Sequence, residues 1–181
     1  MSKNSKKKLF FLALIISIIF LYEVIVFRFY PESSLPDSIK IDKIVLTKSK
    51  RNMTLFANGK SIKTYRVSLG KTPIGAKRVQ GDHKTPEGIY KINGKNGRSN
   101  FHLNLGISYP NELDKQKADS IGKPVGGDIK IHGLAPEYAY LGKFHRLKDW
   151  TDGCIAVTNS EIEELYQNIA IGTVIEIRPV V

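Results

Sequence analysis

One cysteine occurs in this chain, and its neighbours are typical of a reactive thiol. Cys154 follows Gly153 in the string Trp-Thr-Asp-Gly-Cys-Ile-Ala-Val, and the pair His132-Gly133 ends an apolar stretch 22 residues before the cysteine. A thiol attacks acyl groups as its thiolate, and its ordinary pKa of about 8.5 leaves little thiolate at neutral pH. The thiol therefore needs a nearby base, and a histidine is of the right type. The two residues together predict a cysteine nucleophile for acyl transfer.

The residue that acts as the base has two candidates. His132 ends an alternating segment, and Gly133 after it lets the chain turn and leaves room for a substrate. His145 lies nine residues before the cysteine and competes for the same role. His83 and His102 are more remote in the sequence and fit structural roles better. We therefore expect His132 to be the base.

The nucleophile has plainer alternatives. A lone cysteine also fits the role of a small buried side chain. A zinc site is the weaker interpretation, because one cysteine with scattered histidines has no recognised ligand spacing. If Cys154 is the nucleophile, backbone N–H groups around Gly153 and Cys154 are the expected oxyanion hole.

Most of the chain alternates apolar and polar residues with a period near two, which is typical of β-strands. Asn58-Gly59, between two such runs, is the strongest short signal of a hairpin. The predicted strands cover residues 39–46, 53–57, 60–69, 88–92, 101–108, 128–132 and 174–178. We expect a mainly β domain in which His132 ends one strand.

One helix is predicted directly after the cysteine. Thr158 and Glu161 have the spacing of a capping box. The apolar residues that then fall on one helical face, before Gly172, are Ile162, Leu165, Tyr166 and Ile169. Such a helix fixes the backbone beside Cys154, and its N-terminal dipole favours a nearby thiolate.

The first thirty residues resemble a membrane signal. Four lysines within the first eight residues precede an apolar run, 9–27, which contains little polar interruption. As a helix this run is roughly 28 Å long, close to the roughly 30 Å hydrocarbon core of a bilayer. No small-residue cleavage site follows, which favours a retained signal anchor over a cleaved signal peptide. The lysines stay cytoplasmic by the positive-inside tendency, which orients the rest of the chain outside the cytoplasm.

We therefore expect three segments: an N-terminal signal anchor over 1–30, a Pro- and Ser-rich linker over 31–38, and one domain over 39–181. The expected location is the cytoplasmic (inner) membrane with the domain outside the cytoplasm, or the periplasm if the signal is cleaved. The formal charge is +11, and the first thirty residues hold +4 of it (five Lys or Arg against one Glu), which leaves +7. A basic domain in that location favours anionic lipid headgroups and cell-wall polymers over nucleic acid, although a solubility role accounts for the charge equally well.

The same residues carry a resemblance to a known family. Ile-His-Gly-Leu at 131–134 followed by Thr-Asp-Gly-Cys-Ile at 151–155 resembles the signature of the L,D-transpeptidase catalytic domain (YkuD) family, in which an H-G element precedes an S/T-x-G-C element. Lys-Thr-Pro-Glu-Gly at 84–88 is similar to the family's T-P-x-G turn, and Val-Ser-Leu-Gly at 67–70 to the strand end before it. The resemblance runs from about residue 41 to 179, and the cysteine string is similar to the YafK-like branch of the family.

The resemblance implies a mainly β, L,D-transpeptidase-like β-sandwich with one short helix after the cysteine, and peptidoglycan stem peptides as substrate. It implies that Cys154 is the acylated nucleophile, His132 the general base and Thr151 the hydroxyl that helps orient the histidine. Gly133 and Gly153 match the glycines of the two motifs. It implies no metal and no organic cofactor.

The sequence departs from the family pattern in two places. Ala156 replaces the arginine that the family commonly has two residues after the cysteine, so any contact to a substrate carboxylate is absent or supplied elsewhere, for which Arg146 is our candidate. Residues 135–149 form a longer loop than many members have, either a lid that shapes acceptor choice or a simple insertion. Further candidate substrate-binding residues in and beside this loop are Tyr138, His145 and Trp150.

Peptidoglycan L,D-transpeptidase, which crosslinks or remodels the cell wall, is the function that we expect first. In the YafK-like branch the same acyl-enzyme can serve to cut a wall linkage, because water replaces the amine as acceptor. An L,D-hydrolase of crosslinks or of protein-to-peptidoglycan links is therefore the alternative, with a wall-linked protein as a further partner. A non-catalytic wall-binding module and a cysteine peptidase acting on proteins are alternatives from other classes.

Overall fold

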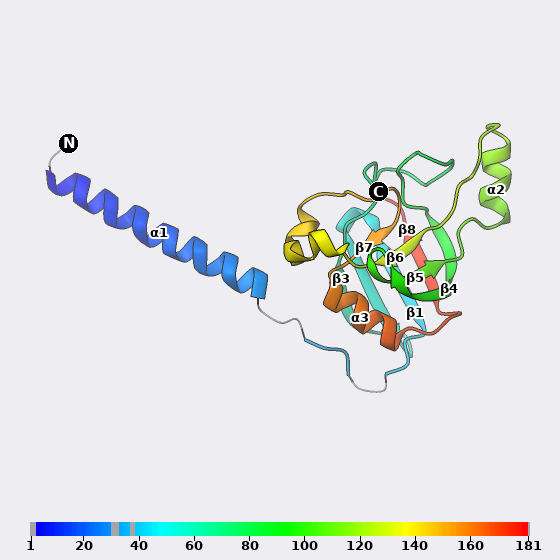
Figure 1. The fold of residues 1–181 in the computed structure, drawn as a ribbon, viewed down its shortest axis with the longest axis horizontal. Helices are drawn as coiled ribbons and strands as arrows, with labels where there is room; N and C mark the ends of the chain where they lie inside the picture. The colour runs from blue at the N-terminus through cyan, green and yellow to red at the C-terminus, as the bar shows by residue number, and fades with distance from the viewer. Residues whose placement is uncertain (1–2, 30–32, 37–38, 181) are drawn as a thin grey trace. The chain divides into compact units, whose positions relative to one another are not determined.

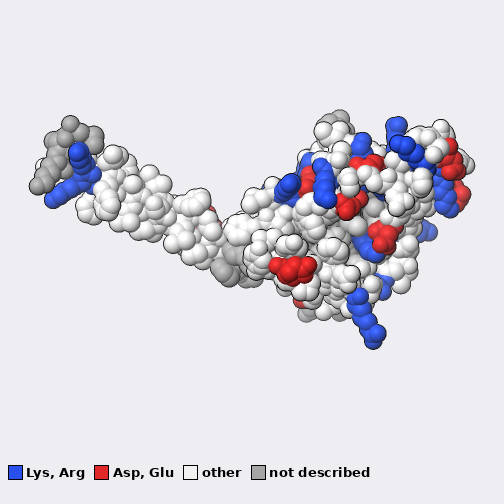
Figure 2. All heavy atoms as spheres, turned by 45° about the horizontal axis from the view of Figure 1, so that its top comes forward, with Lys and Arg blue, Asp and Glu red and all other residues white. Residues whose placement is uncertain are grey.

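The computed structural model describes residues 3–29, 33–36 and 39–180, which fall into two units, 1–33 and 34–181. The first unit is the helix α1 (Lys3–Phe29, Figure 1). Within residues 4–27 an 18-residue window has a mean hydropathy of 2.8 and is not buried by the protein, so the helix is long and apolar enough to cross a membrane. Figure 2 shows basic side chains at its start and a long uncharged surface after them.

The predicted linker, 31–38, lies partly outside the described residues. Of this segment, residues 33–36 are described, and residues 34–36 belong with the second unit. Leu35 is buried in the hydrophobic core, and its backbone N donates to the carboxylate of Glu164. This part of the predicted linker is therefore packed against the domain.

The second unit is built on one eight-stranded mixed sheet. Its strands are β1 (Lys43–Thr47), β2 (Asn52–Ala57), β3 (Lys60–Arg66), β4 (Gly88–Ser99), β5 (His102–Ile107), β6 (Lys130–His132), β7 (Ile155–Ala156) and β8 (Val174–Arg178), in the order β3-β2-β1-β8-β4-β5-β6-β7. The pairs β1/β8 and β6/β7 are parallel, and the other neighbours are antiparallel. The predicted mainly β fold is confirmed, in the form of a half-barrel.

The two ends of the sheet approach each other, so the sheet is curled. The chain that follows β3 forms isolated bridges from Ser68 to Ala156 and from Gly70 to Thr151. Ser68 and Ala156 exchange two backbone hydrogen bonds of 3.0 and 2.9 Å. The segment around Cys154 is therefore held between β6 on one side and residues 68–70 on the other.

The hydrophobic core fills the inside of this curled sheet. In β2 every second residue is buried, as the alternation in the sequence predicts. The helix α3 (Asn159–Asn168) packs its buried Ile162 and Leu165 beside β5 and β6 (Figure 1). Its predicted capping box is confirmed, because Thr158 Oγ1 accepts from the N–H of Glu161 and the Glu161 carboxylate accepts from the N–H of Thr158.

Several elements differ from the sequence prediction, among them the short strand β7, which is not in the predicted set. The strand β4 continues past residue 92 to Ser99, and a helix α2 (Glu112–Asp119) is present. The supposed loop 135–149 is largely a 3₁₀ helix, η2 (Pro136–Leu147), kinked at Gly142, and a shorter one, η1 (Lys48–Lys50), follows β1. The helix α2 was missed because Asp114 and Ala118 are its only buried residues, too few for an apolar stripe to appear.

Candidate active site

Cys154 lies in a turn one residue before β7, and a threonine holds this turn. Thr151 Oγ1 donates to the backbone O of Cys154 at 2.8 Å and accepts from the backbone N of Gly153 at 3.2 Å. Gly153 has a φ of +128°, which L side chains rarely adopt, and a Cβ on it would meet the carbonyl O of Lys84 at 2.6 Å. The motif therefore needs glycine at this position and a hydroxyl at Thr151.

Two expectations change at this turn. The resemblance implies that Thr151 orients the histidine, but its hydroxyl instead bonds within the cysteine turn. The N–H of Gly153, expected in the oxyanion hole, donates to that hydroxyl. An oxyanion that uses this N–H would have to share it with Thr151.

His132 ends β6, the strand next to β7. In this parallel pair Ile131 lies opposite Ile155, and His132 lies opposite Ala156. Residues two apart on a strand point to the same face, so Cys154 comes to the His132 face of the sheet. Both side chains line one cleft.

The ring of His132 is fixed in a single useful tautomer. It is 4 % exposed, and its Nδ1 lies 2.7 Å from the carbonyl O of Gly133. A carbonyl oxygen only accepts, so Nδ1 carries the hydrogen and Nε2 keeps its lone pair. The ring centroids of Phe101 and Trp150 lie 4.6 and 5.7 Å from that of the imidazole. His132 is therefore held as a base that presents Nε2.

Burial shifts the two pKa values in opposite directions. It lowers the pKa of His132, against the hydrogen bond to Gly133, and the charge of Lys130 lowers it further. Burial raises the pKa of the Cys154 thiol, and the backbone N–H and the charge of Lys130 oppose that rise. Both shifts favour a neutral thiol and a neutral imidazole.

The cleft beside Cys154 has a volume of about 330 Å³. Besides Cys154 and His132, it is lined by Asn96, Arg98, Ser99, Asn100, Phe101, Asn104, Asp128 and Lys130. One wall is therefore the hairpin of β4 and β5, which the sequence analysis did not assign to the site. Strand register explains its position, because Asn96 lies opposite Asn104 and Asn104 lies opposite His132.

His145, the competing base, lies behind Trp150. The indole Nε1 donates to His145 Nδ1 at 3.4 Å, and Ser68 Oγ lies 3.3 Å from the same nitrogen. Burial, helped by the charges of Arg146 and His132, lowers the pKa of His145 to about 3. Neither His145 nor Trp150 lines the cleft of Cys154. Trp150 instead packs edge-on against the His132 ring, with the ring centroids 5.7 Å apart.

Arg146 and Tyr138 do not reach the cleft either. The side chain of Arg146 is 8 % exposed, and its guanidinium pairs with the buried carboxylate of Glu161, which also caps α3. Arg146 is thus committed to the start of the helix and does not line the cleft, where the expected contact to a substrate carboxylate would lie. Tyr138 lies on η2, is 54 % exposed and does not line the cleft.

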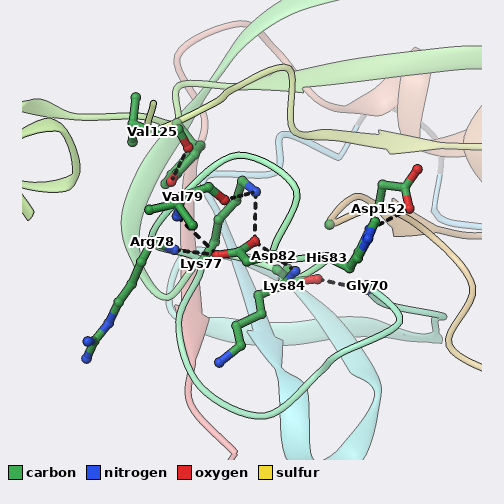
Figure 3. A network of polar contacts seen from close by, with 12 residues as sticks. Gly70, Lys77, Arg78, Val79, Asp82, His83, Lys84, Val125 and Asp152 are labelled. Atoms are coloured by element: carbon green, nitrogen blue, oxygen red, sulfur yellow. Dashed lines mark hydrogen bonds and ion pairs between the residues drawn. The ribbon is translucent and has the colours of Figure 1, made fainter. Parts of the chain in front are cut away.

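The segment between β3 and β4 lies against the other side of the cysteine turn (Figure 3). The Asp82 carboxylate closes this loop, accepting from Lys77 Nζ and from the backbone N of Arg78, Val79 and Lys84. His83 Nδ1 lies 2.8 Å from the carboxylate of Asp152, next to Gly153. His83 is therefore a neighbour of the cysteine turn, although the sequence places it far away. His102 pairs with Glu163 on α3 at 2.6 Å.

Comparison with known proteins agrees with this architecture. The protein YafK of Escherichia coli K12, to which an L,D-transpeptidase activity is attributed, is 27 % identical over 106 residues, which are 58 % of this chain and 35 % of YafK. The helical cell shape determining protein Pgp2 of Campylobacter jejuni superposes with a TM-score of 0.58 at 26 % identity, over 80 % of this chain and 50 % of that one. Bd1075 of Bdellovibrio bacteriovorus gives a TM-score of 0.54 at 26 % identity, over 79 % and 51 %.

This chain therefore spans about half of those two structures and about a third of YafK. The family model of YkuD, the L,D-transpeptidase catalytic domain, matches residues 40–177, which include the cysteine turn, the histidine strand and the hairpin wall. The chain belongs to the YkuD family of L,D-transpeptidase catalytic domains.

Proposed function

We propose that this protein is a peptidoglycan L,D-transpeptidase that works through a thioester on Cys154. The observation that carries the proposal is the joint position of Cys154 and His132, which line one cleft from neighbouring parallel strands. The hydrogen bond from His132 Nδ1 to Gly133 leaves Nε2 as the proton acceptor. Membership of the YkuD family supports peptidoglycan stem peptides as the substrate.

The reaction divides into two acyl transfers. Cys154 Sγ attacks the carbonyl carbon between an L-centre and the following D-residue, and its proton passes to His132 Nε2. The C–N bond then breaks, the leaving amine takes the proton from His132, and a thioester remains. An acceptor amine gives its proton to His132 as it attacks the thioester carbonyl. The C–S bond breaks, and the proton returns to the thiolate.

Hydrolysis by the same acyl-enzyme is the second candidate. Water can replace the acceptor amine without any change in the roles of Cys154 and His132. Ala156, in place of the usual arginine, departs from the family pattern beside the cysteine, and this departure is the reason to test hydrolysis as well. The products would be cut crosslinks, cut protein-to-peptidoglycan links or shortened stem peptides.

The proposed setting is the bacterial cell envelope. Helix α1 serves as a membrane anchor or as a signal, with the YkuD domain outside the cytoplasm. Figure 2 shows basic and acidic side chains interspersed over the domain. The net charge of +7 outside the first thirty residues suits contact with an anionic wall. The proposed partners are peptidoglycan stem peptides and, for the hydrolase, a wall-linked protein.

The test uses the full-length protein in detergent and disaccharide-tetrapeptides, with crosslinked or protein-bearing muropeptides in a second reaction. Mass spectrometry of the products distinguishes the candidates: new dimers indicate a transpeptidase and new monomers a hydrolase. Cys154→Ser, which keeps the size of the side chain, should abolish both. Since the chain has one cysteine, a carbapenem adduct is expected on Cys154 and is lost in that variant.

The alternatives from other classes give different results. A wall-binding module predicts that Cys154→Ala and the unchanged protein bind sacculi equally and that neither releases products. A cysteine peptidase predicts cleavage of an ordinary all-L peptide. Absence of every product together with absence of the carbapenem adduct would reject the enzymatic proposal.

A further inference from the structure

We propose that Arg98 binds a free carboxylate of the donor stem peptide in the cleft of Cys154 and His132. The proposal deepens the proposed function and rests on it. It gives the role of the missing arginine beside the cysteine to a residue from another strand. It also assigns a ligand group to the wall of the cleft that the hairpin of β4 and β5 forms.

The position two residues after the cysteine cannot supply a cation to the substrate. Ala156 is 0 % exposed, and its backbone N and O both bond to Ser68. Val157 next to it donates its N–H to the carbonyl O of His132 at 3.0 Å. A side chain at this position points into packed protein, so a cation for the substrate has to come from elsewhere.

Arg98 reaches the cleft from the end of the β4–β5 hairpin, where the pairing register shifts between Asn96 and Ser99. Asn96, Asn104, His132 and Ala156 lie opposite one another in turn across β4, β5, β6 and β7. Arg98 follows Asn96 by two residues, and its backbone N–H donates to Asn96 Oδ1 at 2.8 Å, which tightens the end of the hairpin. Arg98 lines the same cleft as Cys154.

The charges that line the cleft leave Arg98 uncompensated. Asp128 and Lys130 pair with each other, with Lys130 Nζ 2.6 and 2.7 Å from the two carboxylate oxygens. Among the described residues, the exposed guanidinium of Arg98 has no hydrogen bond and no ion pair. With a neutral thiol and imidazole, the cleft therefore carries one net positive charge.

A carboxylate is the group that this arrangement fits. A guanidinium binds a carboxylate through two parallel N–H donors, which adds geometric specificity to the charge. The amides of Asn96 and Asn100 and the hydroxyl of Ser99 line the cleft beside it and supply neutral donors. A stem peptide offers two kinds of free carboxylate: the C-terminus of the leaving D-residue, or a side-chain carboxylate near the scissile bond.

The experiment measures release of the leaving D-residue, which occurs whether an amine or water resolves the thioester. The full-length protein in detergent is given a tetrapeptide stem as the free acid, as its C-terminal amide, and as the amide of a side-chain carboxylate. The variants are Arg98→Ala and Arg98→Lys. Arg66→Ala, an exposed arginine on β3 that does not line the cleft, is the matched control.

We expect Arg98→Ala to lose about tenfold in kcat/KM on the free acid, mostly through KM, and Arg98→Lys to recover part of it. On the amide of the carboxylate that Arg98 binds, the unchanged protein should already be slower by a similar factor, and Arg98→Ala should change little. The amide that shows this pattern identifies which carboxylate is bound. Equal losses on all three substrates, or no loss at all, would overturn the proposal, as would an equal effect of Arg66→Ala.

A binding measurement separates this inference from the proposed function. Titration of the Cys154→Ala protein with the free acid and the two amides reports affinity without turnover. Suppose that the unchanged protein releases no D-residue, but Cys154→Ala binds the acid more tightly than one amide and the further change Arg98→Ala removes this preference. The carboxylate site then stands and the proposed reaction fails. If turnover occurs without such a preference, the reaction stands and the site fails. Thermal melting of Arg98→Ala shows whether it is folded.

Discussion

Substitution of Gly153 by alanine tests whether the backbone before the cysteine has the strained form that the structure gives it. Gly153 has a φ of +128°, and its missing Cβ would lie 2.6 Å from the carbonyl O of Lys84 and 3.2 Å from the side chain of Ile129. The first contact is with backbone, so a side-chain rotation cannot relieve it. Gly153→Ala must therefore move the cysteine turn or the loop that carries Lys84.

The cost has two parts. An L-residue in a sparsely populated positive-φ conformation costs about 1–3 kcal/mol. Displacement of the turn also strains the two hydrogen bonds of the Thr151 hydroxyl, each worth about 1 kcal/mol. A sum of about 3 kcal/mol corresponds to a fall in Tm of about 10 °C for a domain of this size. A misplacement of about 1 Å between Cys154 and His132 costs about 100-fold in rate.

The assay compares Gly153→Ala with Gly59→Ala in thermal melting and in release of the D-residue from tetrapeptide. Gly59, in the β2–β3 hairpin, has a φ of +73°, and nothing lies within 4 Å of its missing Cβ. Gly59→Ala should lose about 1 kcal/mol from the backbone alone and keep its activity. If Gly153→Ala melts at the same temperature as Gly59→Ala and releases the D-residue at the unchanged rate, the close packing of residues 84 and 153 is refuted.

Three further predictions concern the dyad. His132→Ala should nearly abolish D-residue release while His145→Ala, behind the indole, costs far less; equal losses in turnover assays would return the choice of base to an open question. Thr151→Val leaves the N–H of Gly153 without its acceptor. This variant should lose about 1–3 kcal/mol of unfolding free energy, measured by urea titration, and should lose activity as well. Because burial lowers the pKa of His132 below 6.5, the base stays neutral as the pH falls through 6.5, so the acid limb of kcat/KM should lie below that value. Protonation of this ring disfavours the folded state, so the free energy of unfolding should fall over the same acid range. An acid limb of kcat/KM centred at or above pH 6.5 in a stopped assay would contradict the assignment of His132 as the base.

The positions of the two residues of the proposed dyad were predictable from the sequence, because the elements that carry them are encoded locally. A glycine before Cys154, a strand that ends at His132 and a capped helix after Thr158 are each encoded within a few residues, and all three are present. The pairing of β6 with β7 then brings the two motifs together. Local sequence patterns of this kind predict the structure correctly where no distant contact overrides the local preference.

The wall of the cleft was not predictable, because it depends on register between strands. Asn96 and Arg98 lie in a polar stretch of β4 that has no apolar alternation, so it gave no strand signal. Arg146, near the cysteine in sequence, was the expected cation, but the buried carboxylate of Glu161 binds it instead. Proximity along the chain predicted contact for the turn residues and failed for the cation.

Burial explains why Cys154 and His132 should act together and only on bound substrate. It raises the pKa of the thiol and lowers that of the imidazole, so the resting pair is neutral and not a thiolate beside an imidazolium. A neutral thiol reacts slowly with small electrophiles, because the thiolate is the nucleophile. Proton transfer to Nε2 must therefore accompany the attack, which requires the carbonyl to be held near Sγ. Contacts along the cleft, with Arg98 at one wall, then decide which acyl groups react, so selectivity comes from binding and not from the reactivity of the thiol.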